Sequence, residues 1–144
     1  MFKFIVVLTL AIASANAFWT SCTSGPPPTS VTSPSCSGTS CTVTRGEGLA
    51  ATVVFSPAQS SPVLDVNIRA YFFGQELEIP NSPGNENACV SLSPPCPTTA
   101  NQPHTWNIDI GIPSTLPAIN GHFTFTLAHQ GTPIMCANVT ANLL

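Results

Sequence analysis

Apolar and polar residues alternate one by one in several stretches of this sequence. Between Leu64 and Ala70, every even-numbered residue is apolar and every odd-numbered residue is polar or charged. The same alternation recurs over residues 76–79, 106–112, 123–127 and 135–143. Residues 49–55 are apolar on both sides. A period of two is typical of strands with one buried face, and a continuous short apolar run is typical of a central strand.

The breaks between these stretches favour an all-β fold. The chain has 144 residues and 15 prolines, which leave little room for a long helix. Six or seven short strands separated by loops, in a chain of one-domain length, predict an antiparallel β-sandwich.

The first 17 residues have the features of a secretory signal peptide. Lys3 opens a short positive segment, an apolar run covers residues 4–13, and Ala15-Asn16-Ala17 supplies a small-x-small cleavage pattern. The alternative is a membrane anchor, but the run is too short to cross about 30 Å of hydrocarbon. We therefore expect cleavage before Phe18 and export of a soluble protein with one domain, residues 18–144.

Six cysteines in an exported chain favour disulfides, because compartments outside the cytosol are oxidising. Six thiols allow 15 pairings, and the sequence alone does not choose among them. Proximity suggests Cys36–Cys41 and Cys89–Cys96, which leaves Cys22 to join Cys136. No Cys-x-x-Cys occurs, and no histidine lies at ligand spacing from a cysteine pair, so we expect no metal.

Charged residues make up 6% of the sequence, against roughly 25% in ordinary soluble domains. Cleavage leaves Arg45 and Arg69 as the basic residues, which is too few for a nucleic-acid-binding face. His104, His122 and His129 are scattered, and no Gly-x-Ser-x-Gly motif is present. We expect neither an enzyme nor a cofactor.

One N-glycosylation sequon is present, Asn138-Val139-Thr140. A glycan on Asn138 requires that side chain to face water, which turns Met135, Ala137 and Val139 inward. The sequence leaves open whether the sequon is used.

A series of short motifs links the chain to a known family. They are Cys22 followed by Gly25 and Val31, Cys36-x4-Cys41, Arg45-Gly46 before Val53-Val54-Phe55, Ile79-Pro80, Asn87-Ala88-Cys89, Cys96-Pro97, Pro117, and Gly131 before Cys136-Ala137. In these residues the chain resembles the ML (lipid-recognition) domain family, especially its secreted Niemann-Pick type C2-like and group 2 mite allergen-like members. The likeness covers essentially the whole of residues 18–144.

The resemblance implies an immunoglobulin-like sandwich whose sheets splay apart around a lipid. It also implies the disulfides Cys22–Cys136, Cys36–Cys41 and Cys89–Cys96. In sterol-carrying members the tunnel mouth and wall are formed at positions that correspond to Leu77, Ile112 and Leu116. The best-known cholesterol carriers have aromatic residues at the first and third of these positions, so this chain departs from them.

The inward faces of the alternating stretches supply the expected apolar lining. Besides Leu77, Ile112 and Leu116, the candidate ligand-binding residues are Phe55, Val66, Ile68, Phe72, Trp106, Ile110, Phe123 and Phe125, with Leu64, Ile108 and Leu127 nearby in the pattern. A ligand burying on the order of 400 Å² gains about 10 kcal/mol before the costs of association. Alternating strands occur in any sandwich core, so the periodicity alone does not demonstrate a cavity.

The combined expectation is a secreted carrier of a sterol, a fatty acid or a similar apolar small molecule. We expect it to be a monomer and to pass its ligand to a membrane or a membrane-protein acceptor, in the extracellular fluid or the lysosomal lumen. One alternative is an innate-immune protein that recognises a microbial lipid, although such proteins need cationic residues at the rim. The other is a ligand-free structural secreted protein with a filled core.

Overall fold

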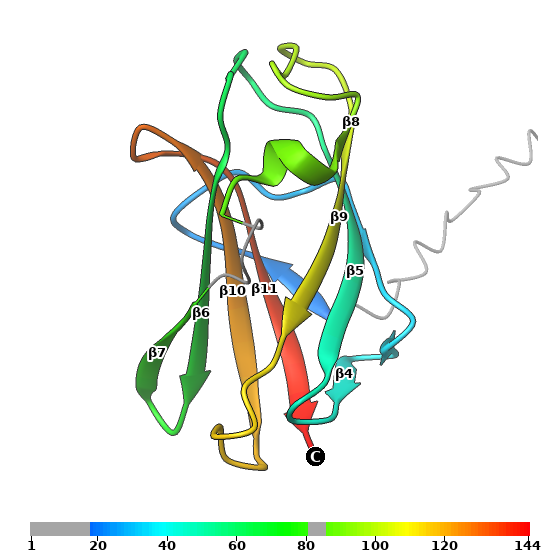
Figure 1. The fold of residues 1–144 in the computed structure, drawn as a ribbon, viewed down its shortest axis with the longest axis vertical. Coiled ribbons are helices and arrows are strands. Elements are labelled where there is room, and N and C mark those ends of the chain that lie inside the picture. The colour runs from blue at the N-terminus through cyan, green and yellow to red at the C-terminus, as the bar shows by residue number, and fades with distance from the viewer. Residues whose placement is uncertain (1–17, 81–85) are drawn as a thin grey trace, which may run out of the picture.

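Each alternating stretch of the sequence forms a strand, and the strands build two sheets packed face to face (Figure 1). The computed structural model describes residues 18–80 and 86–144, so the expected signal peptide lies outside the described residues. The elements are β1 (Trp19–Ser21), β2 (Ser30–Thr32), β3 (Cys36–Ser37), β4 (Ser40–Val43), β5 (Gly48–Phe55), β6 (Asp65–Phe72), β7 (Gln75–Ile79), the 3₁₀ helix η1 (Ala88–Ser91), β8 (Leu92–Ser93), β9 (His104–Gly111), β10 (Asn120–His129) and β11 (Thr132–Leu143).

The predicted sandwich is confirmed, with more strands than the pattern indicated. The six longer strands, β5, β6, β7, β9, β10 and β11, correspond to the six stretches of the sequence. The additional strands β1 to β4 and β8 have two to four residues each. A strand this short shows too little of the two-residue period to be recognised from sequence.

The seven-stranded sheet has the order β3-β4-β11-β10-β6-β7, and its seventh strand, β1, pairs with β11 beside β4. The four-stranded sheet has the order β2-β5-β9-β8. β1 and β4 share one edge of β11: β1 pairs with residues 137–139 and β4 with residues 141–143. The β4–β11 ladder is parallel, whereas the other ladders are antiparallel.

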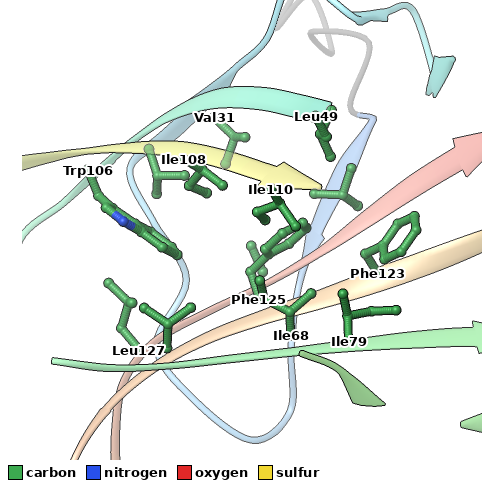
Figure 2. Close-up of a cluster of buried hydrophobic side chains, with 14 of the residues drawn as sticks. Val31, Leu49, Ile68, Ile79, Trp106, Ile108, Ile110, Phe123, Phe125 and Leu127 are labelled. Carbon is green, nitrogen blue, oxygen red and sulfur yellow. The ribbon is translucent and has the colours of Figure 1, made fainter. Parts of the chain in front are cut away.

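The core lies between the two sheets. Figure 2 shows Trp106, Ile108 and Ile110 of β9 directed toward Ile68 of β6 and toward the inward residues of β10. The outward residues between them, such as Asn107 and Asp109, remain exposed. The alternation along each strand therefore places one set of side chains in the core and the other in water, and each large apolar residue buried contributes about 1.5–3 kcal/mol.

The disulfides are the three that the resemblance implies: Cys22–Cys136, Cys36–Cys41 and Cys89–Cys96. The first joins the segment after β1 to β11, and its two cysteines are 114 residues apart in the sequence. In the chain-entropy model, a loop of that length restricts the unfolded chain by about 5 kcal/mol, against roughly 2 kcal/mol for the short Cys36–Cys41 loop. Cys22–Cys136 is therefore the bridge with the largest expected effect on stability.

A glycine on β10 makes room for an aromatic ring on β6. A Cβ atom added at Gly121 would lie 2.3 Å from Cδ1 of Phe72 and 2.5 Å from the carbonyl oxygen of Tyr71. The Phe72 ring also packs edge-to-face against Phe123, with ring centroids 5.9 Å apart. Because the glycine has no side chain, Phe72 can lie across the neighbouring strand and stay buried.

We predict that Gly121→Ala lowers the free energy of unfolding by about 1–3 kcal/mol, since the new methyl group displaces the Phe72 ring. Urea denaturation of purified protein measures this change. Gly48→Ala is the matched control: its closest contact would be the Asp109 Oδ1 atom at 2.8 Å, the end of a side chain, and the nearest backbone atom, the Ile110 oxygen, would lie 3.4 Å away. Equal stabilities for the two variants would contradict this account of Gly121.

Candidate functional site

A narrow apolar slot lies between the sheets at the edge where β2 faces β1 and β3. The four-stranded sheet contributes residues of β2, β5 and β9, and the seven-stranded sheet contributes residues of β3, β10 and β11. The lining residues are Phe18, Val31, Ser33, Cys36, Leu49, Ala51, Val53, Ile108, Phe125, Met135, Ala137 and Val139. All of them are apolar except Ser33, and Cys36 is held in a disulfide. The slot therefore offers a surface suited to hydrocarbon.

Two alanines explain why the slot occurs at this place in the core. Ala51 comes from β5 and Ala137 from β11, so each sheet presents one small side chain to the space between them. The next inward positions on these strands, Val53 and Met135, carry larger side chains and are almost fully buried at the wall of the same slot.

The slot is thin. Its atom-free space amounts to about 360 Å³ when the open mouth is included, but the part that admits a water-sized sphere is about 10 Å³. That second volume corresponds to roughly one water molecule. A lipid chain can enter only if the side chains that face one another across the slot move apart.

The inner face is also open to water at the opposite edge of the sandwich, near Leu77. Leu77 lies two residues before the buried Ile79 and opposite the buried Ala70, which places it on the inner face of the sheet. It is nevertheless 41% exposed. The reason lies in the facing sheet: β8 pairs only with Thr105 and Trp106 of β9, so within the described residues no strand extends further over this edge.

The loop after β9 closes the same end of the sandwich as the β6–β7 turn (Figure 1). Ile112 and Leu116 belong to this segment, and both are buried. Arg45 holds the loop in place: its Nη1 donates a hydrogen bond to the carbonyl oxygen of Leu116 at 3.0 Å, and its Nε donates to the backbone oxygen of Leu144 at 3.1 Å. The β4–β5 turn, the β9–β10 loop and the end of β11 are thereby tied together by one guanidinium group.

The family model for the ML domain matches residues 16–143. The chain belongs to the ML-domain family. Among solved structures, a Niemann-Pick type C2 protein from Japanese carpenter ant is 13% identical, with a TM-score of 0.72 over 88% of this chain and 98% of that one. Chicken MD-1, solved in complex with lipid IVa, is 12% identical, with a TM-score of 0.54 over 85% of each chain. At such identities the likeness shows a shared fold. No curated protein matches the chain.

Most of the candidate ligand-binding residues of this ML domain lie in the core between the slot and the edge strand β7. Phe125 lines the slot, and Leu77 is an exposed residue of the edge strand β7. The others are buried in the core between the sheets: Phe55, Val66, Ile68, Phe72, Trp106, Ile110, Ile112, Leu116 and Phe123. The sequence did not single out the remaining slot residues, chiefly Phe18, Val31, Leu49, Ala51, Met135, Ala137 and Val139. The alternation over 135–143 already turned Met135, Ala137 and Val139 inward, whereas residues 49–55 are apolar on both sides and gave no such sign for Leu49 and Ala51.

Both arginines of the described residues are already engaged away from the slot. Arg45 binds backbone oxygens, as described above, and Arg69 lies on the outer face, where it pairs with Glu76 and bonds Asn67 Oδ1 at 3.1 Å. The hydrogen bond and charge of Glu76 raise the pKa of Arg69 above its ordinary value. Neither guanidinium faces the apolar interior, so neither is placed to hold an anionic group there.

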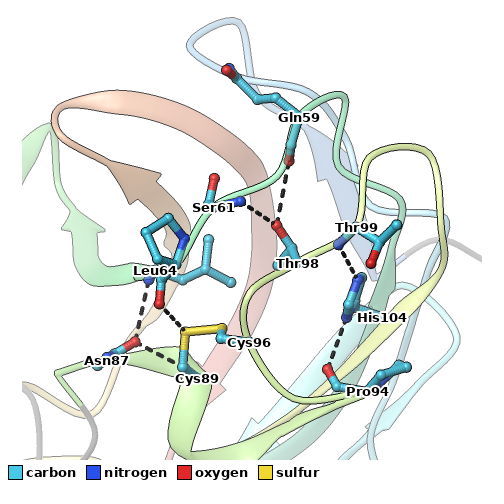
Figure 3. The surroundings of a disulfide bond; sticks show 11 residues. Gln59, Ser61, Leu64, Asn87, Cys89, Pro94, Cys96, Thr98, Thr99 and His104 are labelled. Atoms are coloured by element: carbon cyan, nitrogen blue, oxygen red, sulfur yellow. Dashed lines mark hydrogen bonds between the residues drawn. A yellow bond between two sulfur atoms is a disulfide. The ribbon is translucent and has the colours of Figure 1, made fainter.

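His104 has a structural role (Figure 3). It is 1% exposed, its Nδ1 lies 2.9 Å from the carbonyl oxygen of Pro94, and its Nε2 accepts a hydrogen bond from the Thr99 amide at 3.1 Å. Because Nε2 is an acceptor, Nδ1 is the protonated nitrogen and donates to Pro94. The imidazole thus fastens the loop between β8 and β9, near the Cys89–Cys96 disulfide, and both ring nitrogens are occupied.

The remaining chemistry of residues 18–80 and 86–144 is sparse. No group of three or more His, Cys, Asp or Glu side chains among them is arranged to hold a metal ion. No helix within these ranges is long and apolar enough to cross a membrane. Within these ranges, the apolar interior is the feature best suited to binding a ligand.

We predict that Arg45→Ala lowers the free energy of unfolding by about 1.5–3 kcal/mol, because the carbonyl oxygen of Leu116 loses its charged donor, while the Leu144 oxygen keeps the backbone N–H of residue 45. Arg69→Ala is the matched control: it removes an exposed, solvent-screened ion pair on the outer face, and we expect the stability of this variant to stay close to that of the wild type. Urea titrations followed by tryptophan fluorescence compare them. A larger loss for Arg69→Ala than for Arg45→Ala would refute the anchoring role of Arg45.

Proposed function

We propose that this ML domain is an exported carrier that holds an apolar small molecule between its two sheets and transfers it to a membrane or a membrane-protein acceptor. The observation that carries this proposal is the slot itself. Its walls come from both sheets, and no charged side chain lines it. A hydrocarbon ligand placed there would leave no buried charge without a partner.

Known structures of this fold support a lipid as the ligand. Chicken MD-1 was solved in complex with lipid IVa, and the carpenter ant structure is a Niemann-Pick type C2 protein. The apolar lining described above extends the same chemistry to this chain. We propose no catalytic step and no cofactor.

The narrowness of the slot favours a thin ligand. The open space in the slot is about 10 Å³. To admit a fused-ring sterol, the two sheets would have to move apart over a wide area, which would expose or distort many packed side chains. A single unbranched alkyl chain requires a smaller separation. Leu77 and Leu116 are also flexible aliphatic side chains, so they can adapt to a bending chain. Within the sterol and fatty-acid classes, we therefore place fatty acids and similar chains first.

Besides the mouth of the slot, we propose a second way out for the ligand, past Leu77 at the opposite edge of the sandwich. This residue lies on the inner face yet is open to water. The adjacent β6–β7 turn presents Phe73, which is 86% exposed and has a positive φ of 51°. A bulky aromatic side chain in that conformation is uncommon and here points into solvent. Contact of Phe73 with an acceptor membrane would bring the opening against the lipid surface without the need for a basic patch.

Export fits the covalent structure of the protein. The three disulfides need an oxidising compartment, and the expected signal peptide over residues 1–17 would supply entry to it. We place the mature monomer, residues 18–144, in the extracellular fluid, with the lysosomal lumen as the alternative destination.

We predict that Ala51→Leu weakens binding of a fluorescent fatty acid at least about tenfold, equivalent to 1.4 kcal/mol, because the longer side chain occupies the space the ligand needs. Fluorescence titration of purified protein measures the affinity. Ala50→Leu is the control, since the neighbouring Ala50 is exposed and points away from the slot. Thermal melts check that both variants stay folded. Equal affinities for the two variants would place the ligand elsewhere.

We also predict that Leu77→Glu reduces both fatty-acid binding and the rate of transfer to zwitterionic vesicles by about tenfold, since a carboxylate at the opening must lose water as the ligand passes. Val63→Glu is the control, because Val63 is 38% exposed and lies outside the proposed opening. A fluorescent sterol analogue is titrated in parallel. If neither probe binds the wild-type protein, the carrier function is wrong. If the wild type binds and transfers the fatty acid and Leu77→Glu does so equally well, the route past Leu77 is wrong.

A further inference from the structure

A polar hollow on the outer face of the seven-stranded sheet has no role in the proposed carrier function. It is lined by Cys22, Thr23, Ser24, Tyr71, His122, Thr124 and Asn138. Its volume open to a water-sized sphere is about 200 Å³, against about 10 Å³ in the apolar slot. The hollow and the slot lie on opposite sides of β11, so they are separate features of the same sheet.

The amide of Asn138 is oriented for modification at its nitrogen. The side chains on either side of it, Ala137 and Val139, are buried at 2% and 4% exposure, so strand alternation turns Asn138 to the outer face. The Thr124 hydroxyl donates a hydrogen bond to Asn138 Oδ1, with the two oxygens 2.6 Å apart. Within the described residues, Nδ2 has no hydrogen-bond partner. The nitrogen of the sequon amide therefore remains available at the hollow.

Thr140 completes the sequon on the same face. It lies two residues after Asn138 on β11 and is exposed. The orientation that a glycan at Asn138 requires, with Met135, Ala137 and Val139 inward, is confirmed by their burial. A glycan at this position would extend from the sheet into water without disturbing the core.

Two aromatic side chains, stacked on each other, border the hollow. Tyr71 of β6 and His122 of β10 lie opposite each other in register, and their rings stack with centroids 4.8 Å apart and planes 11° apart. Sugar rings have an apolar face of C–H groups that packs on aromatic rings, while their hydroxyl and acetamido groups need hydrogen-bond partners. Thr23, Ser24 and Thr124 supply hydroxyl groups around the same hollow. This combination of surfaces suits a monosaccharide.

We propose that Asn138 carries an N-linked glycan whose first sugar, N-acetylglucosamine, lies in this hollow against Tyr71 and His122. In the transfer step, Asn138 Nδ2 bonds to the anomeric carbon of an oligosaccharide carried on a lipid diphosphate. The bond from that carbon to the diphosphate oxygen breaks, Nδ2 gives up one proton, and the lipid diphosphate leaves. The modification requires entry into the secretory pathway, as the expected signal peptide provides.

The site is tested on the full chain secreted by cultured insect cells. Mass spectrometry before and after peptide-N-glycosidase treatment should show the loss of one glycan and an aspartate at position 138. Asn138→Gln and Thr140→Ala should abolish the glycan, whereas Thr140→Ser should retain it. An unmodified Asn138 in protein recovered from the medium overturns the proposal. Because that sample is already exported, the result is independent of export, and fatty-acid titration of the same sample tests the carrier function separately.

A second measurement tests the position of the first sugar. Under native conditions, the enzyme should release the glycan from Tyr71→Ala roughly two- to tenfold faster than from the wild type, the range expected for one aromatic contact. Tyr71→Phe keeps the ring and should release it at the wild-type rate. Should Tyr71→Ala fail to fold, His122→Ala removes the other ring and serves in its place. Equal release rates from the wild type and a folded ring-deletion variant overturn the placement in the hollow.

Discussion

Strand β11 is the central element of the molecule, because it pairs with other strands along both edges and carries side chains of both candidate sites on its two faces. β10 runs along one edge of this strand, β1 and β4 divide the other edge, and Cys136 attaches the segment after β1. On the inner face, Ala137 and Val139 line the apolar slot; on the outer face, Asn138 lines the polar hollow. Both candidate sites depend on the register of this one strand, because a strand presents alternate residues to opposite faces.

The sequence predicted the fold well where its pattern was long. The alternation from Leu64 to Ala70 and around Trp106 gives inward and outward residues that the structure reproduces. Proximity and the family resemblance identified the disulfides that the structure contains. The short strands escaped prediction because two to four residues contain at most two repeats of the two-residue period. The parallel pairing of β4 with β11 escaped as well, since it joins segments about a hundred residues apart and leaves no local signal.

The sequence pattern could not predict the position of the slot, for a different reason. Alternation indicates which residues point inward, but free space depends on which residues meet across the two sheets. Ala51 and Ala137 are separated by most of the chain, and only the packing of β5 against β11 brings both to one slot. Leu77 illustrates the same limit: its inward parity was readable, whereas its 41% exposure depends on how far the opposite sheet extends.

The alternation of inward and outward side chains along β11 limits the insertions and deletions that this strand can accept. Deleting or inserting a single codon within this strand would shift every later side chain to the other face. An insertion just before Asn138 would turn its amide toward the apolar interior and turn the apolar side chains that follow it toward solvent. Length variation among descendants of this chain should therefore be tolerated in the turns, such as the one at Gly131, while β11 keeps a fixed number of residues.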